Sequence, residues 1–188
     1  MAVVEIRWHG RAGQGAWTSS NLLAMAAAYE GKHVQSFPAF GPERSGAPML
    51  AFTRISDDPI EVHSMIYSPD ISVVLDETLV SPEVVEGLKD GGILVANFDG
   101  SPADLAKRLE GRKGFEVYVV PATKIALEIL KAGITNTAVL GALLRARPLV
   151  KLESLEKAVR ARFKGKLADL NLEVIRRAYD STTKVSLP

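Results

Sequence analysis

The sequence contains no cysteine among its 188 residues. Without thiols the chain cannot form a disulfide, carry out thiolate chemistry, or bind an iron–sulfur cluster or a zinc ion through cysteine. The absence of cysteine fits the reducing environment of the cytosol. Any redox centre on which this protein depends must therefore be held by another molecule or by ligands other than thiolates.

Long hydrophobic runs and an excess of one charge are also missing. The apolar runs are far shorter than the roughly 20 residues that span a membrane. The N-terminus lacks the basic segment, the apolar stretch and the cleavage site of a secretory signal. The 23 basic and 22 acidic residues give a net charge of +1, so no basic field favours nucleic acid. We therefore expect a cytoplasmic protein, with neither nucleic acid nor a membrane as its partner.

The composition is otherwise that of an ordinary globular protein, and the length suits one domain covering residues 1–188. Short β-rich segments alternate with helical ones over the first 120 residues. The predicted strands are 3–8, 33–37, 49–55, 71–76, 92–98 and 115–120. The predicted helices in this part are 16–30, 82–90 and 101–111. Ser101 is expected to cap the last of these helices, with Pro102 at its first position.

The C-terminal third is helical in pattern. The helices predicted there are 122–133, 135–147, 152–165 and 167–181, and the tail 181–188 is expected to be loose. The run 71–76 is continuously apolar, which is typical of a strand buried on both faces of a parallel sheet. Alternating strands and helices thus predict an α/β fold. Its sheet is mostly parallel, doubly wound and Rossmann-like, with helices on both faces and a helical C-terminal third.

The segment "WHGRAGQG", residues 8–15, places three glycines between a predicted strand and a predicted helix. A helix that starts there leaves its first N–H groups free, and its dipole favours an anion at that end. An alternative is that the glycines only permit a tight turn and close packing of the helix on the sheet. The candidate residues of this glycine turn are Gly10, Arg11, Gly13, Gln14 and Gly15.

Known nucleotide-binding fingerprints fit the glycine turn poorly. The glycine order is G-x-x-G-x-G, whereas the dinucleotide fingerprint is G-x-G-x-x-G. The second predicted strand ends in Phe37 and Pro38, without the carboxylate that binds a ribose. No Gly-Lys-Ser/Thr follows, so the pattern is not a P-loop either. NAD, FAD and ATP are therefore weakly supported as ligands.

A second irregular loop, "FGPERSGAP", occupies residues 40–48. Proline and glycine exclude a regular element there, and long loops in compact domains are often functional. The adjacent charges either stay solvated or dock, with the arginine paired to a carboxylate or a phosphate. The candidate residues of this docking loop are Gly41, Pro42, Glu43 and Arg44.

Other polar residues give weaker signals. Asp76 and Glu77 mark the carboxyl end of a predicted strand, where α/β folds place their sites, but they also suit a helix cap. Asn136 and Thr137 could cap a helix or face a ligand. We expect the three histidines, which lack the spacing of metal ligands, to be structural or exposed: His9, His33 and His63. No catalytic residue and no metal site can be argued from spacing.

Four segments together resemble the gamma subunit of the 2-oxoacid:ferredoxin oxidoreductases, most closely that of the pyruvate enzyme, pyruvate synthase. The segments are "IRWHGRAGQGAWTSSNLLAMAA" (6–27), "FPAFGPERSGAPMLAFTRIS" (37–56), "DISVVLDETLV" (70–80) and "NTAVLGAL" (136–143). The resemblance runs from residue 2 to about residue 180. Its specific signal is the pairing of the glycine turn with the docking loop. One departure is Ala12, where the family commonly has glycine.

The resemblance implies one component of a multisubunit enzyme, inactive alone. That enzyme oxidatively decarboxylates a 2-oxoacid with coenzyme A, giving acyl-CoA, carbon dioxide and reduced ferredoxin. It also implies pyruvate as substrate, with 2-oxoisovalerate, 2-oxoglutarate or indolepyruvate as alternatives. From the residues themselves, a stand-alone nucleotide-binding oxidoreductase remains another alternative.

The resemblance implies alpha, beta and delta subunits as partners of this chain. Thiamine diphosphate with magnesium would lie between alpha and beta, and beta and delta would hold the 4Fe–4S iron–sulfur clusters. The chain would bind no cofactor alone, in line with its lack of cysteine and of a G-D-G…N pattern. Its role would be architectural. The glycine turn would help receive coenzyme A, or both loops would contact the catalytic subunits.

Overall fold

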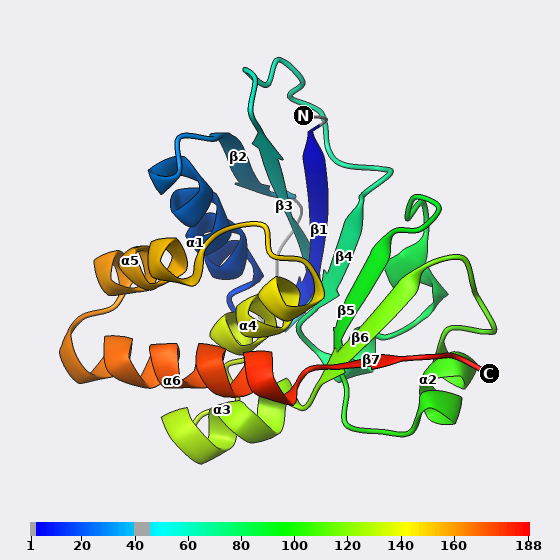
Figure 1. Ribbon diagram of the computed structural model, residues 1–188. Helices are drawn as coiled ribbons and strands as arrows, with labels where there is room; N and C mark the ends of the chain where they lie inside the picture. The colour runs from blue at the N-terminus through cyan, green and yellow to red at the C-terminus, as the bar shows by residue number, and fades with distance from the viewer. Residues whose placement is uncertain (1–2, 40–45) are drawn as a thin grey trace.

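A computed structural model of the chain describes residues 3–39 and 46–188. Within these ranges the strands form one seven-stranded sheet, in the order β2-β3-β1-β4-β5-β6-β7 (Figure 1). The strands are β1 (Val4–Arg11), β2 (His33–Pro38), β3 (Pro48–Ser56), β4 (Ile71–Val74), β5 (Ile93–Asn97), β6 (Glu116–Val120) and β7 (Thr183–Val185). The α/β class predicted from the sequence is confirmed.

The centre of the sheet is parallel and its two sides are antiparallel. Strands β1, β4, β5 and β6 pair in parallel. Strand β3 runs antiparallel to both β1 and β2, and β7 runs antiparallel to β6. Parallel neighbours need a crossover of a dozen or more residues, and only residues 39–47 separate β2 from β3. The expectation of a mostly parallel sheet therefore holds only for the central strands.

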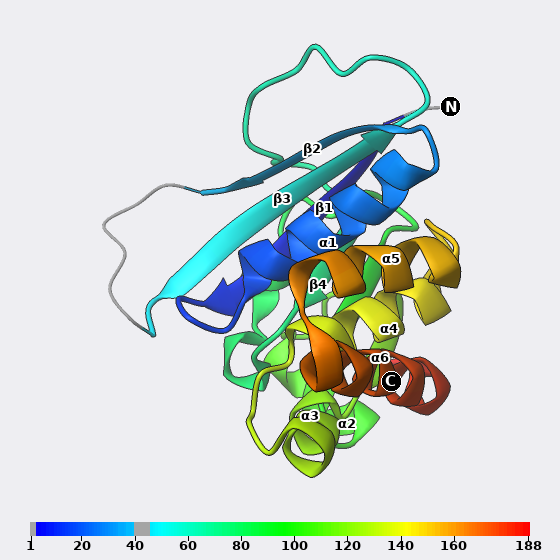
Figure 2. The same ribbon diagram turned by 90° about the vertical axis from the view of Figure 1, so that its left-hand side faces the viewer.

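Helices cover both faces of the sheet, as expected. They are α1 (Ala16–Tyr29), α2 (Pro102–Arg108), α3 (Ala122–Leu130), α4 (Asn136–Ala146), α5 (Leu152–Arg162) and α6 (Gly165–Ser181). Helix α1 and the four C-terminal helices lie together on one side, which Figure 2 shows edge-on. On the other face, α2 packs with the 3₁₀ helix η2 (Pro82–Val85). None of the helices in the described ranges is long and apolar enough to cross a membrane.

Strand β5 illustrates why the central strands read as continuous apolar runs. Ile93 and Val95 point into the larger core beneath α1 and α4. Leu94 and Ala96 point into the smaller core with α2 and η2. Alternate side chains of a strand face opposite sides, so a strand covered on both faces is apolar at most positions.

The helix predicted at 82–90 is wrong beyond its first turn. The structure has the 3₁₀ helix η2 there, and it ends at Val85. Arg7 Nη2 donates to the carbonyl oxygens of Val84 and Glu86, at 3.4 and 2.6 Å. Ser72 Oγ donates to the Val84 oxygen as well, at 2.5 Å. These side chains take the carbonyls that a longer α-helix would use for its own N–H groups.

The tail is more ordered than expected. Residues 181–188 were expected to be loose, but β7 pairs with β6 along the edge of the sheet. The Lys184 ammonium lies 3.1 Å from the Glu116 carboxylate of β6. Pairing satisfies N–H and C=O groups of β6 that an open edge would leave to water.

Candidate functional site

The glycine turn lies between β1 and α1, at the carboxyl edge of the parallel strands. Gly13 and Gly15 have φ angles of 97° and 84°, a left-handed conformation that residues with a Cβ adopt at a cost. A Cβ on Gly15 would lie 2.7 Å from Nδ2 of Asn136. The turn is closed by the Gln14 N–H, which donates to the Arg11 carbonyl at 3.0 Å. The positive φ angles, and the close approach of Asn136 to Gly15, therefore account for glycine at these positions without any ligand.

Helix α1 begins at this turn with its amino end uncapped. Gly15 occupies the N-cap position, no side chain caps the helix within the described residues, and the first turn carries no acid. The first N–H groups of an α-helix have no partner inside the helix, and its dipole is positive at that end. The helix start thus has no side-chain cap among these residues, and its role as an anion site stays a prediction.

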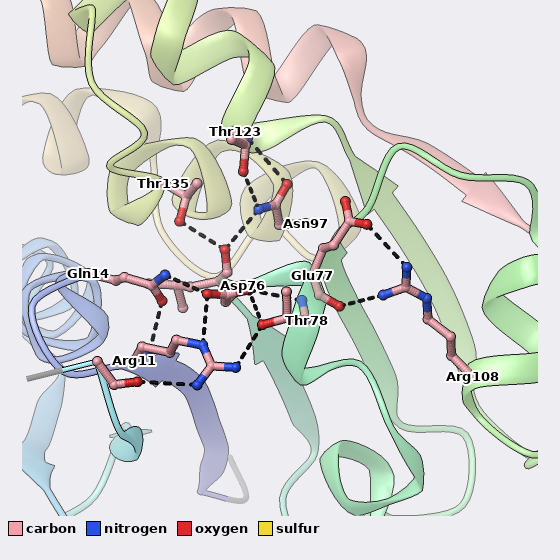
Figure 3. A network of polar contacts seen from close by, with 11 residues as sticks. Arg11, Gln14, Asp76, Glu77, Thr78, Asn97, Arg108, Thr123 and Thr135 are labelled. Atoms are coloured by element: carbon pink, nitrogen blue, oxygen red, sulfur yellow. Dashed lines mark hydrogen bonds and ion pairs between the residues drawn. The ribbon is translucent and has the colours of Figure 1, made fainter. Parts of the chain in front are cut away.

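Arg11 is engaged within the fold. Its Nε lies 3.2 Å from Asp76 Oδ2, beyond the end of β4 (Figure 3). Its Nη2 donates to Thr78 Oγ1 at 2.8 Å, and its Nη1 donates to the carbonyl of Gly46 at 3.2 Å. Arg11 therefore ties the glycine turn to its neighbours, and we assign it a positioning role in place of direct anion binding.

Asp76 is the centre of this network. Gln14 Nε2 donates to its Oδ2 at 2.6 Å, while Thr78 donates to its Oδ1 from both N–H and hydroxyl, at 2.9 and 2.7 Å. Burial of the Asp76 carboxyl raises its pKa. The hydrogen bonds from Thr78 and Gln14, together with the Arg11 charge, outweigh burial and hold the pKa below its usual value. Asp76 is thus both the cap of a 3₁₀ turn, as one alternative expected, and the anchor of the glycine turn.

The described end of the docking loop lies beside the glycine turn. The Ala12 N–H donates to the Ala47 carbonyl at 2.9 Å, and the Gly46 N–H donates to the Ala12 carbonyl at 3.2 Å. The candidate residues of the docking loop lie outside the described residues: Gly41, Pro42, Glu43 and Arg44. Their proposed docking role stays a prediction.

A buried polar cluster fixes the neighbouring strand ends. The Leu75 carbonyl accepts hydrogen bonds from Asn97 Nδ2 and from Thr135 Oγ1, both at 2.9 Å. Asn97 also bonds to the hydroxyl and the N–H of Thr123, at 2.8 and 3.2 Å, where α3 begins (Figure 3). The cluster joins the ends of β4 and β5 to α3 and to the turn before α4. Sequence reasoning missed it, because each bond connects distant segments.

The start of α4 is held by its own polar residues. Asn136 Oδ1 accepts the N–H of Thr137 at 2.7 Å, and the Thr137 hydroxyl donates to Asn171 Oδ1 in α6 at 2.9 Å. The Asn136 carbonyl accepts the Ser19 hydroxyl of α1 at 2.9 Å. Both residues therefore serve packing between helices. Neither caps α4, because its N-cap is Thr135 and no described side chain makes a capping hydrogen bond there.

Glu77 contacts Arg108, which the sequence alone does not predict. Arg108, 31 residues further along, donates to the carbonyl and to a carboxylate oxygen of Glu77, at 2.8 and 3.2 Å. Its guanidinium lies 5.1 Å from the centre of the Phe98 ring. Glu77, Phe98 and Arg108 contribute to the lining of a pocket of about 550 Å³. Because α2 and the end of β4 are separate in sequence, no local pattern could have linked these residues.

The three histidines behave as expected. His33 and His63 are exposed. His9 is 9% exposed, and its Nε2 accepts a hydrogen bond of 3.1 Å from Arg7 Nε. Burial, together with the nearby Arg7 charge, lowers the pKa of His9 to about 3, so it is neutral in the folded chain. Within residues 3–39 and 46–188, no three His, Asp or Glu side chains gather as a metal site would require.

Comparison with known proteins covers nearly the whole chain. Residues 5–181 match the family model described as "Pyruvate ferredoxin/flavodoxin oxidoreductase". The "Pyruvate/ketoisovalerate oxidoreductases common subunit gamma" of Thermococcus kodakarensis is 49% identical over 186 residues, which are 98% of this chain and 100% of the relative. The "Pyruvate synthase subunit PorC" of Thermotoga maritima is 48% identical, over 94% of this chain and 93% of the relative.

A solved structure has the same fold. The crystal structure of pyruvate oxidoreductase subunit PORC from Thermotoga maritima superposes with a TM-score of 0.89 at 43% identity. The match covers 99% of this chain and 100% of that one. Similarity of this extent includes the glycine turn, the central sheet and the C-terminal helices in one continuous unit.

Proposed function

This chain belongs to the pyruvate ferredoxin/flavodoxin oxidoreductase family, and from that premise we propose that it acts as the gamma subunit of a pyruvate:ferredoxin oxidoreductase. The complex would convert pyruvate and coenzyme A to acetyl-CoA and carbon dioxide while reducing ferredoxin. The observation that carries the proposal is similarity to gamma subunits from end to end, at close to half identity. A stand-alone nucleotide-binding oxidoreductase is disfavoured, because the glycine turn lacks the dinucleotide fingerprint.

The redox chemistry of such a complex would take place on other chains. This sequence has no cysteine, so it offers no thiolates for an iron–sulfur cluster. Two pairs of charged side chains at the carboxyl edge of the sheet are engaged with each other, Arg11 with Asp76 and Arg108 with Glu77. We assign thiamine diphosphate with magnesium and the 4Fe–4S clusters to alpha, beta and delta subunits, which would pass electrons to ferredoxin.

We propose further that this chain does not select the 2-oxoacid. The Thermococcus relative is named as a gamma subunit common to pyruvate and ketoisovalerate oxidoreductases. A subunit shared by two enzymes cannot by itself distinguish their substrates. If the same holds here, an exchange of gamma subunits between complexes leaves the preference for pyruvate, 2-oxoisovalerate, 2-oxoglutarate or indolepyruvate unchanged. The cytoplasmic location expected from the sequence stays a prediction.

The glycine turn is the proposed point of contact with coenzyme A. Its supports are the uncapped amino end of α1, the absence of an acid in the first helical turn, and the open space around Gly13, where a Cβ would meet no atom within 4 Å. The backbone donors of residues 13–17 would take a phosphate of coenzyme A. Arg11 and Gln14 would hold the turn in place through their contacts with the Asp76 carboxylate.

Co-purification tests the subunit assignment. An affinity tag on this chain, expressed in its native source, should retrieve chains that carry thiamine diphosphate and iron. The retrieved complex should reduce ferredoxin only when both pyruvate and coenzyme A are present, and the chain alone should be inactive. Redox turnover by the isolated chain, or its purification without any thiamine-binding partner, would overturn the assignment.

Steady-state kinetics of the assembled complex test the ligand role of the glycine turn. In the assembled complex, Gly13→Val places a side chain among the proposed donors and should raise the KM for coenzyme A while leaving the KM for pyruvate unchanged. Gly133→Ala, far from the donors in sequence and free of neighbours within 4 Å, is the matched control. Unchanged coenzyme A kinetics in the valine variant would leave the turn a purely structural role.

A further inference from the structure

The connection between β3 and β4 is a long segment without helix or strand. It covers residues 57–70 and lies on the side of β2 and β3 away from α1, as Figure 2 shows. Connections of this length without regular structure are uncommon in compact domains and are usually functional or disordered. Two sets of contacts show that this one has a defined path.

The first set comes from a buried arginine of the sheet. Arg54 is 2% exposed, and its Nη2 donates to the carbonyl of Ser64 at 2.8 Å. Its Nη1 reaches the carbonyl of Val62 at 3.4 Å, and its Nε pairs with the Glu5 carboxylate at 2.9 Å. Since the Arg54 side chain is neutralised and held by β1, it fixes the middle of the connection against the sheet.

The second set fixes the remainder of the connection. Ile66 is 2% exposed, so its side chain is packed inside. The Lys89 N–H donates to the carbonyl of Pro69 at 3.0 Å. At Gly87 a Cβ would lie only 2.2 Å from the carbonyl oxygen of Tyr67, so the two backbones meet closely. The segment is thus held along its length, and its exposed side chains are presented by a fixed backbone.

Three large apolar side chains on this fixed segment face solvent. Val62 is 55% exposed, Met65 45% and Tyr67 68%. Tyrosine and methionine are enriched in protein interfaces, and tyrosine is frequent among residues that dominate binding energy. A backbone that is ordered before binding avoids the entropy cost of ordering on contact. These features are those of a preformed contact surface.

The charges of the same segment indicate the partner. Residues 57–70 include four acids and neither lysine nor arginine. Two of these acids are paired within the chain, Asp57 with Lys32 and Asp70 with Lys89. Glu61, next to the exposed apolar residues, makes no ion pair within the described residues. A complementary surface would have an apolar depression with lysine or arginine at its rim.

We propose that residues 61–67 form the contact through which this chain docks onto another subunit of its oxidoreductase complex, one that offers an apolar depression rimmed by basic side chains. The proposal rests on the proposed function, which supplies the partner. The segment leads into the amino end of β4, whereas the glycine turn follows the carboxyl end of the parallel strand β1. Docking through 61–67 therefore leaves the glycine turn at the opposite edge of the sheet open to a ligand.

Assembly of the whole complex with a substituted gamma chain tests the contact. The double variant Met65→Ala/Tyr67→Ala should dissociate from the complex at least about 30-fold more readily on dilution, followed by native mass spectrometry. The matched control is Leu127→Ala/Leu167→Ala, which removes two apolar side chains that are each 51% exposed on helices α3 and α6. It should dissociate as the unsubstituted chain does. Circular dichroism of both variants checks that they fold.

A charge variant tests the chemistry of the partner. Glu61→Lys places a cation opposite the proposed basic rim, and it should weaken assembly most at low salt, because salt screens repulsion between like charges. The contact is overturned if the double variant assembles like the unsubstituted chain, or if it changes only self-association of the isolated chain. In both cases the subunit assignment stands. If the unsubstituted chain fails to enter any complex, it is the proposed function that fails.

Discussion

The side-chain amide of Gln14 donates a 2.6 Å hydrogen bond to Oδ2 of Asp76, and this contact joins the turn after β1 to the end of β4. The same carboxylate pairs with Arg11 and accepts two hydrogen bonds from Thr78. One acid therefore sets the position of the glycine turn relative to the parallel sheet. The arrangement fixes the shape of the turn through the side chains of Arg11 and Gln14.

Replacement of Asp76 by asparagine should loosen this junction. The amide side chain of Asp76→Asn would present one acceptor oxygen and no charge to Arg11, so the folded chain should lose about 2 kcal/mol of unfolding free energy. Urea denaturation measures the loss. The control is Asp90→Asn at an exposed position, which should change stability by less than about 0.5 kcal/mol. Equal stability of the two variants would contradict the anchoring role of Asp76.

The two glycines of the turn should differ in their tolerance of a methyl group. At Gly13 an added Cβ meets no atom within 4 Å, so Gly13→Ala should cost only the backbone strain, about 1 kcal/mol. At Gly15 the added Cβ also meets the Asn136 side chain at 2.7 Å, at the start of α4. Gly15→Ala should therefore destabilise the chain by about 2–3 kcal/mol. A smaller loss in Gly15→Ala than in Gly13→Ala would refute this account of the turn.

Features that depend on neighbouring residues were predictable from the sequence. Strand β4 (Ile71–Val74) lies within the predicted range 71–76, and its mostly apolar sequence reflects burial on both faces of the sheet. Ser101 caps α2, with Asp104 completing a capping box three residues later. The uncapped, glycine-led start of α1 is equally local. Each of these signals lies within one element and its flanks.

Features that depend on the arrangement of distant elements were not predictable. Strand β3 inserts between β2 and β1, which changes the direction of one side of the sheet, and no residue within β3 specifies that neighbour. Arg7 takes the carbonyls that would have extended η2 into the expected helix. The partner of Glu77 lies in α2 and that of Asp76 in the glycine turn. The sequence shows that these side chains are polar, but their pairing depends on the three-dimensional fold and could not be predicted from the sequence.

Buried His9 should make the chain sensitive to mild acid. An exposed histidine titrates near pH 6.5, whereas burial and the nearby Arg7 lower the pKa of His9 to about 3. Between these values the unfolded chain binds a proton that the folded chain does not. Stability should therefore fall as the pH drops below about 6.5, by up to about 1.4 kcal/mol per pH unit from this residue.

Denaturation midpoints between pH 6.5 and pH 4.5 measure this slope. In His9→Gln the side chain keeps an acceptor for Arg7 but cannot titrate. The dependence of unfolding free energy on pH should therefore become shallower, by up to the contribution of one bound proton. The unsubstituted chain, measured over the same pH range, is the reference. A His9→Gln variant with an unchanged slope would show that this histidine does not govern the acid response.

The close contact between α4 and α6 supplies the last prediction. At Gly141 an added Cβ would lie 2.2 Å from the carbonyl oxygen of Ile175 and 3.1 Å from the backbone nitrogen of Tyr179. Alanine is normally favoured over glycine inside a helix by about 1 kcal/mol. Here the steric conflict is with backbone, which cannot rotate away, so Gly141→Ala should lower stability by at least about 2 kcal/mol. Gly133→Ala, with no atom within 4 Å, should change stability by less than about 0.5 kcal/mol. A gain in thermal stability for Gly141→Ala would mean that the two helices are not packed this closely.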